Sequence, residues 1–203
     1  MVKGCVDQIR AAARAAGRDP DELLVYTQAL IVTAPTAELA RARYGDYLDH
    51  VNVEAALALL SGWTGVDFSR LPLDATIDYI GTEAGRGTLA SLSSADPDKT
   101  WTVREAARFI GLGGRGPVLV GDPGQVADQL ESWLDDTGAD GFNLAFAVAH
   151  ESMRDVVEPV VPELQRRGRY RQDYEGGTLR RQLPGRGDRL AADHPGRRVE
   201  LAA

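Results

Sequence analysis

The sequence predicts an α/β fold in which strands and helices alternate along the chain. Three apolar segments, at 24–32, 118–120 and 142–148, have the composition of strands that are covered on both faces. Segments with helical spacing of apolar residues and with capping signals stand between them. This alternation is typical of parallel βα units, and three such strands are too few to close a barrel.

The first helix is expected at 3–17, where apolar residues recur at helical spacing and Gly17 is a stop signal. It is followed by turn residues at 18–21 and then by the strand at 24–32. The apolar positions of this helix are Val6, Ile9, Ala13 and Ala16.

Two further helices are expected before the middle of the chain. Thr33 is predicted to cap a helix at about 34–49, and Asn52 to cap a shorter helix at 53–61. The stretch 62–99 is rich in glycine and proline and predicts an irregular insertion with at most a short helix at 88–94. So long a loop is uncommon within a domain, and we interpret it as a lid over a site.

Two capping boxes mark the helices of the second half. Thr102 and Glu105 begin a helix that stops at the glycine-rich run 111–116. Asp122 and Gln125, with Pro123 at the first helical position, begin the next helix after the strand at 118–120.

The C-terminal part is expected to end in a helix and a tail. A helix is predicted at 152–167, bent or restarted at Pro159 and Pro162. The chain is polar and rich in Gly and Arg after Gly168, which predicts a disordered basic tail at 184–203. The predicted domain is therefore 1–183, with an insertion at about 62–100.

Composition excludes several functional classes. The formal net charge of −7 argues against nucleic acid as a partner, and the arginines that follow 165 favour a solvated end over a site for polyanions. The lone Cys5 permits no disulfide within the chain, and no Cys/His set has zinc spacing. Cysteine usage makes the cytoplasm the expected compartment, and no apolar run is long enough to span a bilayer, so a soluble protein is expected.

Three local motifs favour structural interpretations over binding sites. The run 111–116 precedes a strand, which is the wrong context for a dinucleotide site, and Asp122 with Pro123 favours capping over phosphate binding at the helix after 121. The run 81–87 favours a lid loop over an anion site. The three histidines lack metal spacing, and only His150 is expected near a pocket, as a general base or, more in keeping with its position, a helix-start residue.

Several segments together resemble one enzyme family. GDPGQVADQLESW at 121–133, GADGFNL at 138–144, VVPELQRRGRYR at 160–171 and YEGGTLRRQL at 174–183 resemble the end of the luciferase-like flavin-dependent monooxygenases. The branch with the closest pattern contains the nitrilotriacetate, dibenzothiophene-sulfone and long-chain-alkane monooxygenases. The resemblance extends from about residue 3 to residue 183.

The resemblance implies the C-terminal part of a TIM (β/α)₈ barrel. By position, the strands at 24–32, 118–120 and 142–148 resemble the sixth, seventh and eighth barrel strands, and the first five are not in the chain. Barrel active sites lie at the carboxyl ends of the strands. We therefore expect Asn143, Leu144, Phe146 and His150 to form part of a pocket wall for substrate or flavin, although the first three also fit ordinary core or rim positions. No catalytic residue and no metal ligand are assigned.

The family's activity is implied in the same way. Reduced FMN, supplied by a separate flavin reductase, and O₂ would oxygenate a small organic substrate; deazaflavin F420 is the alternative cofactor. The protein would be a homo-oligomer or would need a complementary N-terminal half. Two alternatives stay open: a truncated or split chain without catalysis, and a small α/β interaction module.

Overall fold

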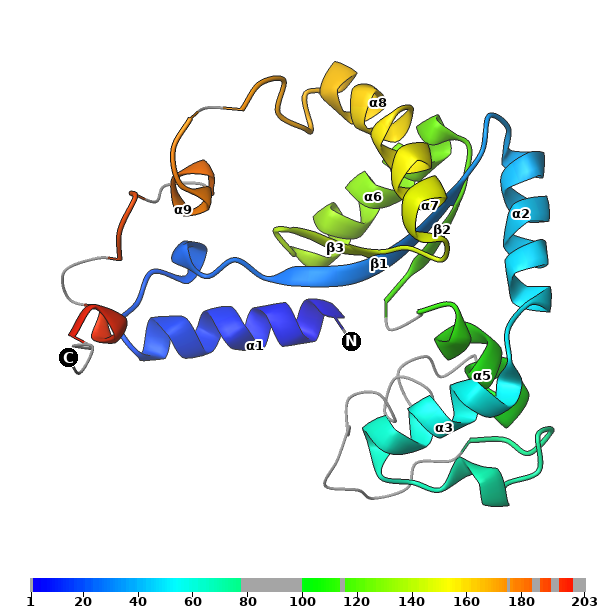
Figure 1. Cartoon of the computed structure of the whole chain (residues 1–203). Helices are drawn as coiled ribbons and strands as arrows, with labels where there is room; N and C mark the ends of the chain where they lie inside the picture. Colours follow the sequence, from blue (N-terminus) through cyan, green and yellow to red (C-terminus); the bar gives the residue numbers. More distant parts are fainter. Residues whose placement is uncertain are drawn as a thin grey trace, which may run out of the picture. The chain divides into compact units, whose positions relative to one another are not determined.

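The computed structural model describes residues 2–77, 100–113, 116–174, 176–183, 187–190 and 194–198. The chain divides into two compact units, Met1–Leu164 and Gln165–Ala203. The first unit holds the sheet and nearly all of the helices (Figure 1). The tail boundary expected near 183 stays a prediction.

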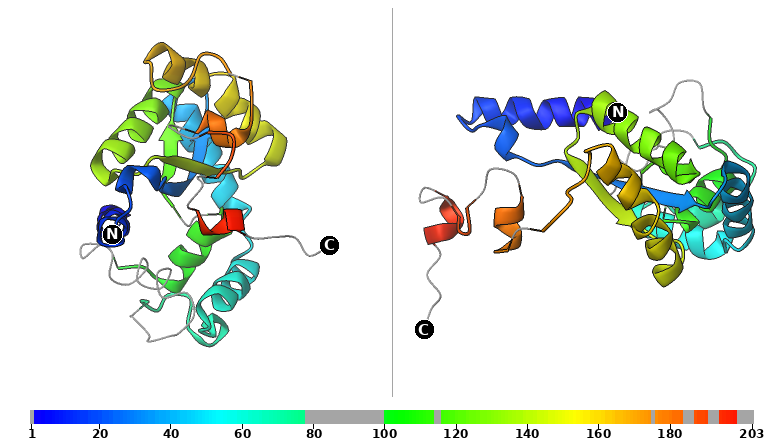
Figure 2. Two further views of the ribbon diagram at one scale, coloured as in Figure 1. Left: turned by 90° about the vertical axis from the view of Figure 1, so that its left-hand side faces the viewer. Right: turned by 90° about the horizontal axis from the view of Figure 1, so that it is seen from above.

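A parallel sheet of three strands forms the centre of the first unit. β1 (Tyr26–Thr33) lies between β2 (Val118–Gly121) and β3 (Gly141–Ala145). Both pairs are parallel, as predicted, with Leu30 beside Val118 in one pair and beside Ala145 in the other. The carboxyl ends of the strands therefore point the same way, toward the beginning of α2 (Figures 1 and 2).

The strand order differs from the order that the barrel numbering implied. Consecutive barrel strands are hydrogen-bonded neighbours, so a sixth, seventh and eighth strand in chain order would place β2 in the middle. β1 pairs directly with β3 instead, and β2 pairs only with 30–33. β1 therefore lies between the other two strands, with β3 beside its first part and β2 beside its last part.

Helices cover one face of the sheet. α6 (Pro123–Thr137), α7 (Ala149–Val157) and α8 (Val160–Arg166) lie on this face, and α1 (Val2–Ala15) contacts α6 (Figure 1). The helix expected at 152–167 is two helices, broken once at Pro159, where the ring removes a backbone donor. The buried residues of this core are Ala29, Ile31, Leu119, Val126, Leu130, Val156 and Val160.

α2 (Ala37–Asp49) begins later than expected. Its N-cap is Thr36, whose Oγ1 accepts a hydrogen bond of 3.3 Å from the Leu39 amide. Thr33 is not the cap, because its backbone is still paired with Gly121 in the sheet. The Thr33 hydroxyl is buried and has no hydrogen-bond partner.

A second core lies around α3 (Val53–Thr64) and α5 (Val103–Gly111). The 3-10 turn η2 (Phe68–Arg70) and Ile77 pack into it, and Thr76 pairs with Thr102 in an antiparallel bridge. The described part of the predicted insertion, 62–77, is therefore packed structure and not an open loop. The short helix expected at 88–94 and the glycine run 81–87 lie outside the described residues.

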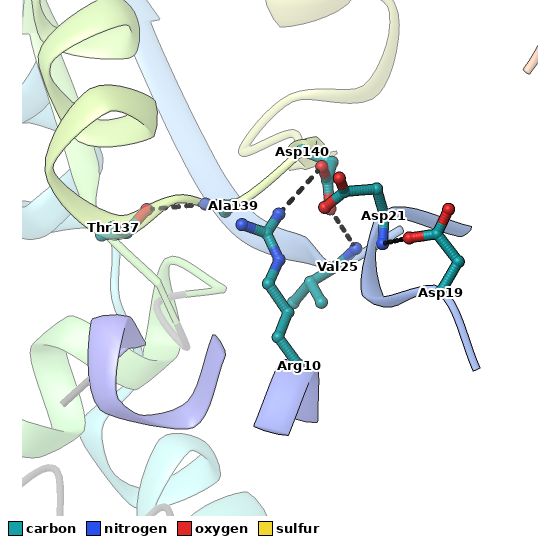
Figure 3. A network of polar contacts seen from close by, with 7 residues as sticks. All are labelled: Arg10, Asp19, Asp21, Val25, Thr137, Ala139 and Asp140. Carbon is teal, nitrogen blue, oxygen red and sulfur yellow. Dashed lines mark hydrogen bonds and ion pairs between the residues drawn. The ribbon is translucent and has the colours of Figure 1, made fainter. Parts of the chain in front are cut away.

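A polar latch joins the beginnings of β1 and β3 to α1 (Figure 3). Asp140 Oδ2 accepts a 2.7 Å hydrogen bond from the Val25 amide, and the Asp140 amide donates to the Val25 carbonyl at 2.8 Å. Asp140 Oδ1 pairs with Arg10 Nη2 at 3.3 Å. Nearby, the 3-10 turn η1 (Pro20–Glu22) is capped by Asp19. This end of a barrel sheet contributes to stability rather than chemistry.

The second unit has short elements, α9 (Leu179–Gln182) and η3 (Pro195–Arg198), which the sequence did not predict. The Tyr170 and Tyr174 hydroxyls lie 3.2 Å apart, and the Arg171 guanidinium stands over the Tyr174 ring. No residue of this unit whose exposure is known is buried. Within the described residues of the whole chain, no helix is long and apolar enough to cross a membrane.

Candidate functional site

A cavity of about 530 Å³ lies on the side of the first unit where the parallel strands end. Four segments form it: the end of α2, the start of α3, the end of α5 and the loop that follows β3. Its lining residues are Asp46, Tyr47, His50, Val51, Asn52, Ala55, Ala56, Leu59, Gly111, Leu112, Ala147 and Val148. This is the side on which barrel enzymes bind their ligands.

The short connection between α2 and α3 places most of the polar groups. α2 ends at the C-cap His50, and the Asn52 side chain caps α3 by accepting a 2.9 Å hydrogen bond from the Ala55 amide. Only Val51 separates these two caps, so both stand at one wall of the cavity.

The His50 ring is held in a defined orientation. Its Nδ1 lies 2.8 Å from the Asp46 backbone oxygen, and 3.7 Å from the Asp46 carboxylate. A carbonyl oxygen only accepts, so Nδ1 donates, and Nε2 of the neutral ring is an acceptor. The hydrogen bond to the Asp46 carbonyl, aided by the Asp46 carboxylate, raises the pKa of His50.

Gly111 and Val51, which both line the cavity, lie very close together. A methyl group at Gly111 would overlap the Val51 side chain and touch Ala56. Gly111 does not have a positive φ, so its backbone does not require glycine. The close approach of Val51 is the physical reason for a residue without a side chain here.

The cavity is supported by the α3–α5 core. Leu60, Phe68 and Val103 are fully buried directly behind its α3 wall. Burial also raises the pKa of the nearby Tyr44 phenol, with a smaller opposing effect of the Arg108 charge. Arg108 itself is paired with Asp49 at 3.0 Å and is not among the lining residues.

None of the four residues predicted for the pocket wall lines this cavity. Leu144 packs on the helix-covered core of the sheet. Phe146 is half-buried and lies just after β3. Asn143 is exposed and stands beside Gln28 in the strand register, and His150 is exposed in the first turn of α7. The structure does not gather these four into one site, and their roles stay predictions.

The wall instead contains residues that the sequence did not single out. From the end of β3 it takes Ala147 and Val148, which lie between the predicted Phe146 and His150. The signal for His50 was present in the sequence as Asp46 at i−4, a spacing that brings two side chains together on a helix. The proximity of Gly111 to Val51 had no local signal.

The other interpretations of motifs can be compared with the structure. Asp122 and Thr102 cap their helices in full capping boxes, as predicted, and Asp122 occupies the N-terminus of α6. Within the described ranges, no group of three or more His, Cys, Asp or Glu side chains could hold a metal ion.

The cavity fits part of a flavin and not all of it. Its apolar walls suit a flat ring or an apolar substrate, but among the described residues that line it there is no Lys or Arg to pair with a phosphate. The start of α3 is capped by Asn52 and carries Glu54 in its first turn, so this helix end is a poor anion site.

The fold and the position of the cavity define a class, a partial luciferase-like barrel. The family model described as luciferase-like monooxygenase matches residues 2–141, which is more than half of the chain. The chain belongs to the luciferase-like monooxygenase family, as the sequence motifs predicted.

The relatives agree with the predicted branch. The chain is 45% identical over 188 residues to dimethyl-sulfide monooxygenase of Hyphomicrobium sulfonivorans, covering 92% of the chain and 39% of the relative. It is 34% identical over 194 residues to long-chain alkane monooxygenase of Geobacillus thermodenitrificans, covering 95% and 40%. Nitrilotriacetate monooxygenase component A of Aminobacter aminovorans is 34% identical over 174 residues, covering 82% and 38%.

Solved structures support the same fold. DmoA from Hyphomicrobium sulfonivorans superposes with a TM-score of 0.79 at 43% identity, over 92% of this chain and 39% of that one. A riboflavin lyase crystallised with modified FMN and riboflavin gives 0.82 at 31% identity, over 97% and 43%. The chain spans about two fifths of the length of the relatives it matches, so the predicted partial barrel is confirmed.

Proposed function

We propose that this chain is part of an FMN-dependent monooxygenase that oxygenates a small organic substrate with O₂. Membership of the luciferase-like family is the observation that carries the proposal. The cavity at the carboxyl end of the strands supports it, because this is the end at which barrel enzymes bind their ligands.

The choice of cofactor and partner has support from the relatives. A riboflavin lyase with 31% identity contains modified FMN, which favours FMN over deazaflavin F420. The name nitrilotriacetate monooxygenase component A indicates a system of more than one component, which fits a separate flavin reductase. The bound flavin would supply the oxygen-activating chemistry.

The roles of this chain's residues follow from their positions. Val51, Leu59, Leu112 and Val148 would exclude water from one side of the reacting groups. His50, with Nδ1 held by Asp46, would present Nε2 as the acceptor of a proton or hydrogen bond at the rim. The Asn52 side chain is committed to capping α3 and would act by position only.

The direct test is a flavin titration of the chain alone, followed by the quenching of flavin fluorescence. We expect binding with a Kd on the order of micromolar, equivalent to about −8 kcal/mol. Riboflavin is the matched control ligand, because it lacks the phosphate. The cavity offers no cationic partner for phosphate, so the two affinities should agree within about threefold, less than 1 kcal/mol.

A second candidate is a chain that does no catalysis without a complementary N-terminal half. Within the described residues, β3 pairs only with β1, and the outer edge of β3 is therefore open to another strand. Micromolar binding of FMN by the chain alone contradicts this candidate. Absence of binding, restored by adding the N-terminal part of a relative, supports it over the enzyme acting alone.

A further inference from the structure

We infer that the α2–α3–α5 cavity selects uncharged molecules with an apolar body and rejects carboxylate anions. The inference rests on the proposed function, because it names the substrate class of the same site. Three features carry it: the apolar walls, the signs of the nearby charges, and the close packing of Val51 against Gly111.

Apolar side chains form most of the wall and meet solvent. Leu59 and Val148 expose 43% and 42% of their surface, which is high for large apolar residues of a folded unit. A ligand that covers them removes this apolar area from water, and the gain grows with the area covered. The apolar lining residues are Val51, Ala55, Ala56, Leu59, Leu112, Ala147 and Val148.

The charges around the cavity oppose an anion. Asp46 contributes the carboxylate of the lining, and Glu54 stands in the first turn of α3. Arg108 of α5 is held by Asp49 at 3.0 Å and by the Leu48 carbonyl and does not line the cavity. His50 is the one lining side chain that can become cationic, and above its pKa it is neutral. A carboxylate would therefore lose water without gaining a cationic partner.

Gly111 and Val51 meet in the lining of the cavity, so the position of the Val51 side chain depends on the absence of a side chain at residue 111. Val51 packs directly against the Gly111 backbone, at the place where any side chain on residue 111 would stand. A methyl group there would displace the Val51 side chain, which lines the cavity, and so change the shape of the wall. Gly45 of α2 offers a matched comparison, because a methyl group at Gly45 meets no atom within 4 Å.

The test compares an uncharged and an anionic probe of similar length, 2-heptanone and heptanoate, by NMR chemical-shift titration of the full chain. The pH is kept at about 8.5, which is about two units above the ordinary pKa of histidine, to limit the positive charge on His50. We expect 2-heptanone to shift the amide signals of Leu59, Leu112 and Val148 in a saturable way, and heptanoate at the same concentration to leave them unmoved.

Variants locate the binding. Gly111→Ala should weaken 2-heptanone binding at least about fivefold, whereas Gly45→Ala should leave it unchanged, since one methyl group in an apolar pocket produces effects of this size or larger. Asp46→Asn removes the carboxylate from the lining, so heptanoate should now shift the same amide signals, and the affinity for 2-heptanone should not fall. If Gly111→Ala fails to fold by circular dichroism, Leu59→Asp at the exposed rim takes its place and should weaken 2-heptanone likewise.

Equal binding of heptanoate and 2-heptanone, no binding of 2-heptanone, or identical behaviour of Gly111→Ala and Gly45→Ala overturns the inference. The FMN titration separates it from the proposed function. Binding of 2-heptanone as expected, with no binding of FMN, leaves the cavity's selectivity standing and removes the flavin enzyme. Binding of FMN together with a preference for heptanoate over 2-heptanone supports the proposed function and overturns the inferred selectivity.

Discussion

Replacement of Asp140 by alanine should be the most destabilising single change to a polar residue of the sheet. Asp140 Oδ2 accepts the Val25 amide at 2.7 Å, and Oδ1 pairs with Arg10 at 3.3 Å (Figure 3). A hydrogen bond to a charged acceptor contributes about 1.5–3 kcal/mol. The ion pair adds at most about 1 kcal/mol, because each side chain keeps about a quarter of its exposure.

The expected cost of Asp140→Ala is therefore about 3 kcal/mol in the free energy of unfolding. The change leaves the Val25 amide and the Arg10 guanidinium without their partner, and Arg10 Nε is already buried without a hydrogen bond. For a chain of this length, we expect a fall in Tm of about 6–12 °C, followed by circular dichroism and by urea unfolding.

Two variants separate the contributions. Asp140→Asn keeps an acceptor for Val25 and loses only the charge, so it should cost about 1 kcal/mol. Asp136→Ala is the matched control on the exposed end of α6, where the carboxylate accepts only from Ser132, and should stay within about 0.5 kcal/mol of wild type. If Asp140→Ala and Asp136→Ala have the same Tm, the contacts of Asp140 do not stabilise the sheet and the prediction is wrong.

Three further predictions use the same chain. Leu60→Ala should lower the free energy of unfolding by about 3 kcal/mol, because Leu60 of α3 is fully buried in the core with α5. Leu59 is 43% exposed, so Leu59→Ala should lower it by less than about 1 kcal/mol, and equal urea midpoints of the two variants would contradict this. Gly138→Ala should cost about 1 kcal/mol in the same assay, since Gly138 ends α6 at φ 69° with room for a methyl group, and an unchanged midpoint would show that the strain is absent. The NMR titration midpoint of His50 should lie above about 6.5 and fall in Asp46→Asn; the raised pKa means that His50 stabilises the fold below that ordinary value and that this contribution is lost as pH rises through its folded-state pKa.

Local chemistry made most helix boundaries predictable. The capping boxes at Thr102 and Asp122 and the Asn52 cap depend on residues three apart, so they can be read without knowing the fold. Thr33 shows where this reasoning stops. Thr33 and Thr36 are both threonines, a preferred N-cap residue, so local sequence favours either one as the N-cap of α2. Only the pairing of the Thr33 backbone with Gly121 decides that the helix starts later.

The strand order lay beyond local reasoning for a similar reason. Each strand reads as apolar and buried, and nothing within 118–121 says which neighbour it will have. The order β2-β1-β3 is decided by the pairing of β1 with β3 along 26–30, which leaves β2 only the last part of β1. The family resemblance predicted a partial barrel but not which strands are neighbours in the sheet.

The candidate site shows how strand alternation limits an expectation based on strand ends. Successive side chains of a strand face opposite sides, so Leu144 on the helix-covered face and Asn143 on the other cannot both belong to one wall. The cavity draws instead on Ala147 and Val148, where the chain has left the strand and this alternation no longer applies. Gly111, at the end of α5, also has a role that depends on tertiary contacts. Locally it is a stop signal, but its φ is not positive, and the reason for a glycine is the Val51 side chain, brought there from another helix junction by the fold. A residue whose role depends on such a tertiary approach can be assigned only once the approaching group is known, so neither the set of lining residues nor the close packing of Val51 on Gly111 could be predicted from the sequence.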